Sequence, residues 1–406
     1  NYFTSFFKVL LLLLSGTILF LSDNYLKKND LHIYEFPVLI CLAVLGMLIM
    51  VSSNDLMVLY IGVEMQSLSL YIITAFRRDN LRSTEAGLKY FILGALSSGI
   101  LLYGISLIYG SIGSTQFHII YGSIMHTDNA LGLQIGMVFL ISGIAFKFSS
   151  FPFHMWTPDV YEGSPTSVTS FFSIVPKVAA ITIFIRFLYV PFVNIISEWQ
   201  TIIVFLSIAS MVFGAVAAIG QTNIKRLVAY SSIGHIGYTL AGLATASNEG
   251  IQSSIIYISI YVVMNLALFS CLLMLRRKDQ YYEDIDDLSG LSKNHPLLSL
   301  CLLLILFSLA GIPPLAGFFA KFYVFKAVLE QSMYFLAIVG LLSTVVAAFY
   351  YLRIIKIIYF DKEKEKYDSD HSLWLKFSLA SSTILILLYF IFPSQLIEVV
   401  SRINII

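Results

Sequence analysis

Charged residues are scarce in this sequence. Asp, Glu, Lys and Arg make up 12% of the 406 residues, whereas soluble globular domains carry about 25%. The net charge is +1, so the chain has no basic surface of the kind that binds nucleic acids. Hydrophobic residues make up 58% of the chain. They recur in runs long enough to cross a hydrocarbon core of about 30 Å. These features exclude a soluble domain and predict an all-α polytopic membrane protein.

Cysteine motifs and glycine-rich nucleotide motifs are also missing. The three cysteines, Cys41, Cys271 and Cys301, are isolated within apolar segments and show no CxxC spacing. This pattern excludes a cysteine-held iron–sulfur cluster or zinc site. No Rossmann or P-loop pattern of glycines occurs either. We therefore expect no redox cofactor, nucleotide site or metal in this chain.

About twelve segments are apolar and long enough to be transmembrane helices. They span residues 4–22, 36–53, 55–76, 84–109, 131–156, 165–190, 199–220, 224–246, 251–275, 296–327, 332–359 and 373–392. Lysine and arginine concentrate in alternate connections, at 22–35, 77–83, 221–226, 276–295 and 360–372. By the positive-inside rule, these connections lie on the inner side and both termini lie on the outer side.

The connection at 157–164 departs from this alternation. It should lie inside, yet it carries Asp159 and Glu162 and no cation. Acidic residues have little weight in the rule, so the orientation stands. The mixture of Pro158 and Gly163 with these acids predicts a polar turn.

An internal repeat accounts for most of the spans. One group of five helices occupies 34–190 and a second group occupies 191–360. An N-terminal helix and loop at 1–33 and a C-terminal loop and helix at 361–406 flank them. Because five is an odd number, the second group is expected to be inverted relative to the first, as is common in transporters.

The fourth helix of each group is expected to be broken. Pro152 interrupts the first, and Pro313 and Pro314 interrupt the second. Interrupted helices at membrane depth are tolerated only where protein or water satisfies the freed backbone groups. We therefore expect non-helical backbone near residues 149–152 and near 312–315.

Glu64, Lys147, Lys177 and Lys321 are charged side chains surrounded by apolar residues of their spans. Charges at membrane depth are costly, so they mark either an ion pathway or a tightly paired structural site. Burial disfavours a charged lysine and a nearby carboxylate favours it, so a lysine between the two effects can take and release a proton. We expect Glu64 to pair, directly or through water, with Lys147 or Lys89.

Each of these residues has a structural alternative. Glu64 can form a plain hydrogen bond between helices. A lysine near a helix end can extend its ammonium group to the interface. That alternative suits Lys177, which follows Pro176, better than Lys147 or Lys321, which lie well inside their spans.

Lys89 and His235 complete the candidate set, and both remain open. Glu85 lies four residues before Lys89, so an ordinary ion pair on one helix face explains Lys89 as well as a functional role does. His235 can relay protons near neutral pH, but a satisfied buried histidine is nearly as good an interpretation.

Four stretches resemble a known family. They are STEAGLKYFILGALSSGILLYG at 83–104, FPFHMWTPDVYEGSPTSV at 151–168, QTNIKRLVAYSSIGHIGY at 221–238 and AGIPPLAGFFAKFY at 310–323. The chain resembles the antiporter-like membrane subunits of respiratory complex I, which are similar to subunits of Mrp-type cation/proton antiporters. The resemblance extends along the chain from about residue 30 onward, and DVYEGSPT distinguishes it from the sister subunits.

The resemblance implies a proton-translocating module without redox centres. Glu64 matches the family's key glutamate, Lys147 the lysine of the first broken helix and Lys177 the connecting lysine. Lys321 matches the lysine of the second broken helix. Lys89 matches a further lysine near the glutamate, and His235 a polar linking position.

The resemblance also implies partners and a location. The partners expected are other membrane subunits of the complex, including neighbouring antiporter-like and small membrane subunits, together with lipids. FMN, iron–sulfur clusters and ubiquinone are expected in other subunits. Abundant Phe, Tyr and Ile favour a mitochondrial inner membrane, with a bacterial plasma membrane as the alternative. The first residue is Asn1 rather than Met, which suggests that an upstream piece is missing, cleaved or encoded separately. The resemblance implies fourteen spans in the bacterial subunit, whereas about twelve are expected here.

Two rival functions remain. One is a subunit of an Mrp-type cation/proton antiporter, which the DVYEGSPT stretch disfavours. The other is a purely structural role in which the buried charges serve packing alone.

Overall fold

The computed structural model describes residues 2–125, 130–278 and 280–403, and these residues are almost entirely helical. The helices are α1 (Tyr2–Lys28), α2 (Glu35–Ser52), α3 (Leu56–Thr74), α4 (Leu81–Ile112), α5 (Phe117–Ser123), α6 (Ala130–Lys147), α7 (Trp156–Gly163), α8 (Thr166–Tyr189), α9 (Ile196–Ile219), α10 (Ile224–Ala244), α11 (Asn248–Leu272), α12 (Leu291–Asn294), α13 (Pro296–Ala310), α14 (Ala316–Glu330), α15 (Tyr334–Phe360), α16 (Leu373–Leu388) and α17 (Ser394–Ser401). Short 3₁₀ helices cover Val193–Ile195 and Ile285–Leu288, and β1 (Arg276–Arg277) pairs antiparallel with β2 (Gln280–Tyr281).

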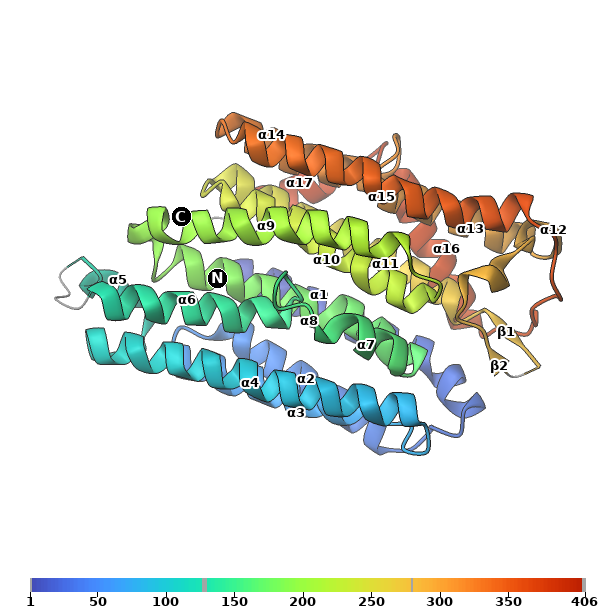
Figure 1. Cartoon of the computed structure of the whole chain (residues 1–406), viewed down its shortest axis with the longest axis horizontal. Coiled ribbons are helices and arrows are strands. Elements are labelled where there is room, and N and C mark those ends of the chain that lie inside the picture. The colour runs from blue at the N-terminus through green and yellow to red at the C-terminus, as the bar shows by residue number, and fades with distance from the viewer. Residues whose placement is uncertain (1, 126–129, 279, 404–406) are drawn as a thin grey trace.

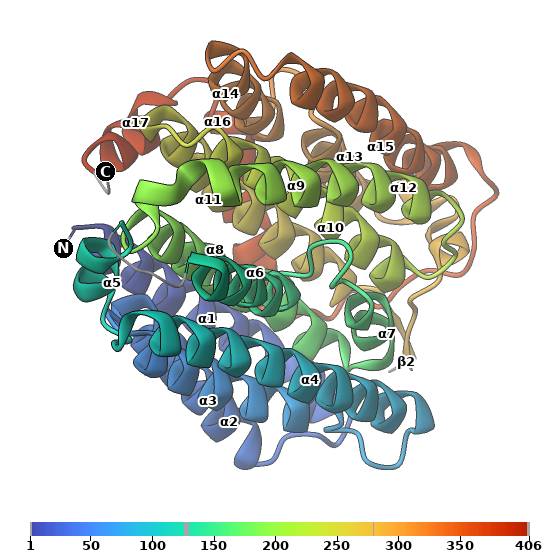
Figure 2. The same cartoon turned by 60° about the vertical axis from the view of Figure 1, so that its left-hand side comes forward.

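The long helices run roughly along one axis, and the connections gather at its two ends (Figure 1). The β1–β2 hairpin and α12 lie at one end, while α5 and both termini lie toward the other (Figure 2). The hairpin belongs to a lysine- and arginine-rich connection and α5 to one without either residue. This distribution agrees with the alternation of basic connections in the sequence.

Among the residues that the structure describes, eight helices are long and apolar enough to cross a membrane: α1, α2, α3, α4, α8, α9, α11 and α15. Three shorter apolar helices, α6, α13 and α16, accompany them. The remaining predicted segment, 224–246, is helix α10, nearly all of whose residues are buried. Every predicted segment thus contains a helix, and the chain is an all-helical membrane protein with eight long apolar spans.

Both predicted helix breaks are confirmed. α6 ends at Lys147 and α7 begins at Trp156, while α13 ends at Ala310 and α14 begins at Ala316. Side chains from neighbouring helices satisfy backbone groups in the breaks. Ser210 of α9 accepts the first break's Phe151 N–H at 2.9 Å, as buried polar backbone requires.

The polar turn expected at 157–164 is wrong, because these residues form helix α7. Pro158 lies in the first turn, where a missing N–H costs no helical hydrogen bond. Asp159 also lies in the first turn, where the positive end of the helix dipole favours a carboxylate. Pro158 and Asp159, which suggested a turn in the sequence, therefore lie at the start of a helix.

Helices α8 and α10, which carry Lys177 and His235, are among the most enclosed. The apolar stretch of α8 is completely buried and that of α11 is 83% buried, against 39% for α4. α10 packs closely on α9, since a Cβ added at Gly214 would lie 2.5 Å from the backbone nitrogen of Gly234. Lys177 on α8 and His235 on α10 therefore lie in the interior of the bundle.

Two loops at the hairpin end are docked on each other. The Arg277 guanidinium lies 4.1 Å from the ring centre of Tyr367 and 4.8 Å from that of Tyr282. The Tyr367 N–H donates to His295 Nε2 at 3.1 Å. Burial lowers the pKa of His295 below its ordinary value of 6.5, and the charges of Lys366 and Arg277 act in the same direction.

Candidate functional site

Glu64 and Lys147 are each hydrogen-bonded to a serine. Ser98 of α4 donates to the half-buried Glu64 carboxylate. Lys147 is buried, with 8% of its surface exposed. Its ammonium donates to the Ser67 hydroxyl at 2.8 Å. Glu64 and Ser67 are three residues apart on α3 and share one face. A direct ion pair between Glu64 and a lysine does not occur among the described residues, and the water-bridged form stays a prediction.

Lys89 pairs with carboxylates other than Glu64. Its exposed ammonium pairs with Glu85 at 2.8 Å and with Asp159 of α7 at 2.9 Å. The pair with Glu85 confirms the i,i+4 interpretation of the sequence. Asp159 was not foreseen as a partner, because its stretch was expected to be a turn.

Lys177 is almost completely buried, at 1% exposed. Its ammonium donates to the Ser232 hydroxyl of α10 at 2.5 Å and lies 5.4 Å from the ring centre of Tyr161. Ser232 in turn donates to the carbonyl of Ala229 at 2.7 Å. Lys177 therefore lies deep in the bundle and does not reach an interface, so the alternative of an extended surface lysine does not fit it.

His235 lies between two tyrosines. Its Nδ1 is 2.7 Å from the hydroxyl of Tyr257 on α11, and its Nε2 is 3.2 Å from the hydroxyl of Tyr351 on α15. Tyr351 is also hydrogen-bonded to Ser231 of α10. Both ring nitrogens are thus satisfied within the bundle, in an arrangement that links three helices.

Lys321 uses backbone carbonyls as partners. Its ammonium extends from α14 to the carbonyls of Ala310 at 3.0 Å and Leu309 at 3.3 Å, which end α13. The last carbonyls of a helix have no partner within the helix and carry a partial negative charge. The same ammonium lies 5.0 Å from the ring centre of Tyr238 on α10.

Each broken helix has a lysine close to its break, but the two lysines use different partners. Lys147 is the last residue of α6, and its ammonium donates to Ser67 of α3. Lys321 extends back from α14 to the last carbonyls of α13. One lysine precedes its break and the other follows its own.

α10 carries a row of polar side chains between Lys177 and Lys321. Ser232, His235 and Tyr238 are spaced at three residues and so lie on one face of the helix. The first contacts Lys177, the last contacts Lys321, and the rings of His235 and Tyr238 are 6.2 Å apart. Only His235 was predicted, since serine and tyrosine are frequent in apolar helices and give no distinct signal.

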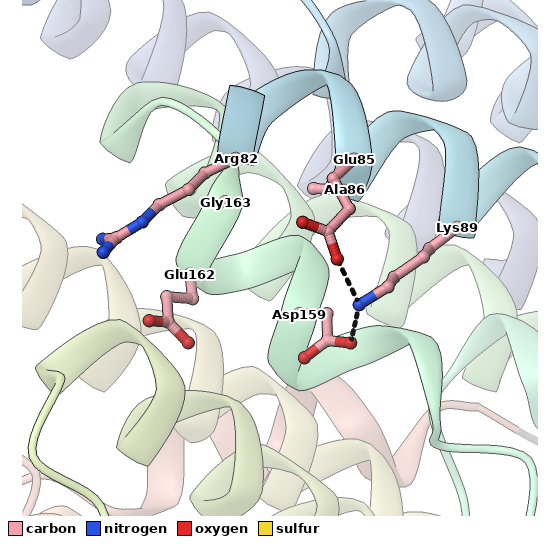
Figure 3. A pocket seen from close by; sticks show the side chains of 7 residues that line it. All are labelled: Arg82, Glu85, Ala86, Lys89, Asp159, Glu162 and Gly163. Atoms are coloured by element: carbon pink, nitrogen blue, oxygen red, sulfur yellow. Dashed lines mark hydrogen bonds and ion pairs between the residues drawn. The ribbon is translucent and has the colours of Figure 1, made fainter. Parts of the chain in front are cut away.

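A chain of ion pairs lies at the hairpin end and joins three helices. Asp159 of α7 pairs with Lys89 of α4 and, at 2.7 Å, with Arg226 of α10; Arg226 also pairs with Glu162 at 3.0 Å. Figure 3 shows Glu85 and Asp159 both pointing at the Lys89 ammonium, beside a cavity of about 200 Å³. These pairs balance the acidic residues that broke the charge alternation of the sequence.

Metal-binding groups are not found in the part of the chain that the structure describes. No three His, Cys, Asp or Glu side chains there lie together in a way that could hold a metal ion. Cys41, Cys271 and Cys301 are free.

The chain is similar to known proteins over nearly its whole length. Residues 53–347 match the family described as NADH:quinone oxidoreductase/Mrp antiporter, TM. NADH-quinone oxidoreductase subunit N of Pelagibacter ubique is 70% identical over 403 residues, which cover 99% of this chain and 85% of that protein. Subunit N of Rhodospirillum rubrum is 50% identical over 397 residues, which cover 98% and 82%.

Solved structures share the fold. A chain of respiratory complex I from Thermus thermophilus matches with a TM-score of 0.84 and 30% identity, over 98% of this chain and 86% of that one. A chain of the Mrp complex from Dietzia sp. matches with a TM-score of 0.85 and 22% identity, over 97% and 82%. At that identity the second match concerns the fold alone.

Proposed function

Since the chain belongs to the family of subunit N, the antiporter-like, proton-translocating membrane-arm subunit of NADH-quinone oxidoreductase (complex I), we propose which of its residues carry the protons. The proposed path comprises Glu64, Lys147, Lys177, His235 and Lys321. Lys89 is placed at the hairpin end, outside the buried part of the path.

One observation gives this path its strongest support. The partners of Lys147, Lys177 and Lys321 are hydroxyls and carbonyls, and none of the three forms an ion pair with a described carboxylate. A carboxylate in direct contact would hold a buried ammonium in its charged form. Neutral partners satisfy the donor without fixing its charge, which suits a group that must take and release a proton.

The proposed order of events starts outside this chain. Quinone reduction elsewhere in the complex changes the charge of a neighbouring membrane subunit. That change alters the Glu64–Lys147 interaction and passes through Lys177 and His235 to Lys321. One charge crossing 100 mV costs about 2.3 kcal/mol, which is within reach of a rearranged buried charge pair.

We also propose that the fold consists of two inverted repeats within twelve spans. The first, at 34–190, contains α2, α3, α4, α6–α7 and α8. The second, at 191–360, contains α9, α10, α11, α13–α14 and α15. Residues 1–33 and 361–406 flank the repeats. The break in the fourth helix of each group, with a lysine in each broken helix, supports this division.

We infer the membrane and the partner subunits of this chain from its relatives. The matched proteins named above are bacterial, so we propose a bacterial plasma membrane; the mitochondrial location and ubiquinone as the quinone find no support among them. The proposed partners are neighbouring antiporter-like and small membrane subunits and lipids. FMN and iron–sulfur clusters are assigned to other subunits of the complex.

The test of the path uses Lys147→Ala and Lys321→Ala in the intact complex, reconstituted in vesicles. We expect assembly to survive and proton translocation per assembled complex to fall, with NADH oxidation falling alongside because the two are coupled. Lys362→Ala, which changes an exposed loop lysine, is the control. Loss of assembly would favour the structural role, since a buried hydroxyl or carbonyl left without its hydrogen bond costs about 1–3 kcal/mol. Unchanged pumping would remove both lysines from the path.

A further inference from the structure

Helix α7 is a short segment that contacts the surroundings of two buried lysines. At its start, the Trp156 indole donates to the carbonyl of Phe146 at 2.9 Å, one residue before Lys147. Further along, the ring centre of Tyr161 lies 5.4 Å from the Lys177 ammonium. α7 has eight residues, and the backbone between it and α6 is not helical. A displacement of α7 would therefore change the surroundings of both lysines together.

The opposite face of α7 is held by ion pairs. Asp159 accepts from Lys89 of α4 through one carboxylate oxygen and from Arg226 of α10 through the other, at 2.9 and 2.7 Å. Glu162 adds a second contact to Arg226 at 3.0 Å. Figure 3 shows Asp159 pointing from α7 toward Lys89. Asp159 thereby connects α7 to two long helices at once.

These ion pairs are too exposed to be a main source of stability. The side chains of Asp159, Arg226 and Lys89 are 32%, 31% and 45% exposed, and pairs at this exposure contribute little to folding. Trp156, Val160 and Tyr161 of α7 are buried hydrophobic residues and pack it into the bundle. The ion pairs thus determine where α7 lies more than whether the chain folds.

We propose that Asp159 is a positioning residue for proton translocation. Through Lys89 and Arg226 it fixes α7, and α7 fixes the surroundings of Lys147 and Lys177. Asp159 acts through these contacts and carries no proton along the path itself. The inference rests on the proposed function, because it takes Lys147 and Lys177 to be proton carriers.

The test is Asp159→Asn in the assembled complex, reconstituted in vesicles. Asparagine keeps the size of the side chain and removes its charge. We expect assembly to persist and translocation per assembled complex to fall about tenfold, since small misplacements far from the chemistry have effects of this order. Asp159→Glu, which restores the charge, is expected to recover most of the rate. Glu330→Gln removes an exposed carboxylate from a pair on α14 and is expected to change neither assembly nor translocation.

A second variant keeps the test decisive. Arg226→Gln removes the α10 side of the connection and is expected to lower translocation as Asp159→Asn does. The losses should be less than additive in the double variant, because both single variants remove the Asp159–Arg226 pair. If Asp159→Asn fails to assemble, Arg226→Gln decides by its own rate. Parental translocation in the assembled variants, or no recovery with Asp159→Glu, overturns the proposal.

Lys147→Ala and Lys177→Ala, measured in the same way, separate the two proposals. If both variants pump normally, the proposed path itself fails. If those variants stop pumping while Asp159→Asn does not, only the positioning role of Asp159 is overturned.

Discussion

Lys177 depends on one hydroxyl. Its ammonium is enclosed by α8, α7 and α10, and Ser232 accepts its hydrogen bond. A buried charged donor that loses its acceptor costs about 1–3 kcal/mol or more. The protonated form of Lys177 is therefore sensitive to a single neighbouring atom, which makes Ser232 a direct test of the path.

We expect Ser232→Ala to slow proton translocation by about tenfold, because 1.4 kcal/mol changes a protonation equilibrium tenfold. Ser232→Thr keeps the hydroxyl and is expected to retain most of the rate. The measurement is translocation per assembled complex in vesicles. Equal rates for the alanine and threonine variants would show that this hydrogen bond does not matter for transport.

For single residues, the sequence identifies the buried lysines but not their hydrogen-bond partners. Lys147, Lys177 and Lys321 are recognisable because a lysine within an apolar run is costly and uncommon. Their partners Ser67 and Ser232 are not, because a serine hydroxyl can bond to its own helix and needs no partner elsewhere. Which hydroxyl faces which ammonium depends on how the helices pack, and hydropathy does not encode that.

Among the elements, the two docked loops at the hairpin end respond to pH. The Tyr367 N–H donates to His295 Nε2, which must then be unprotonated. The pKa of His295 is lowered in the folded state, so the unfolded chain binds its proton more readily. The stabilising contribution is therefore complete above about pH 6.5 and is lost as the pH falls below that value.

We expect the loop at 361–372 to loosen on acidification. Amide hydrogen exchange there, corrected for its intrinsic pH dependence, should be faster relative to the rest of the chain at pH 5.5 than at pH 7.5. In His295→Gln, the side-chain carbonyl accepts the same N–H at either pH, so the difference should disappear. A difference that persists in this variant would assign the effect to His371, whose pKa burial also lowers.

Helix α7 shows the limit of local patterns at the element scale. Proline correctly locates both breaks, because it disfavours a regular helix interior, although Pro176 lies within α8 without ending it. Proline and glycine at 157–164 suggested a turn. Whether Pro158 ends a helix or begins one depends on where the helix starts, and that start is fixed by tertiary contacts such as Trp156 stacking on Tyr90 at 4.5 Å.

For the whole molecule, the basic connections predict a definite orientation. Connections with lysine and arginine gather at the hairpin end and those without at the α5 end (Figure 1). The sequence alone predicts this arrangement, because the lysine and arginine bias acts over whole loops and does not depend on how the helices pack. The hairpin end should therefore face the inner side.

Cysteine labelling tests this orientation. In a variant lacking Cys41, Cys271 and Cys301, we introduce Glu365→Cys at the hairpin end or Gln331→Cys at the other end; both positions are exposed. In sealed right-side-out vesicles, an impermeant maleimide is expected to label the residue at 331 and not the one at 365. The cysteine-free parent is the control for background. The reverse labelling would invert the assignment of sides.

The partners of Lys321 are peptide carbonyls of Leu309 and Ala310, and this has a consequence for how the site changes during evolution. Every amino acid supplies the same carbonyl, so the side chains at 309 and 310 can diverge while the ligand set stays constant. What must be retained is the end of α13, which requires Gly317: a Cβ there would lie 1.8 Å from the Ser308 carbonyl oxygen. Selection on this part of the path falls on a residue that never touches the proton.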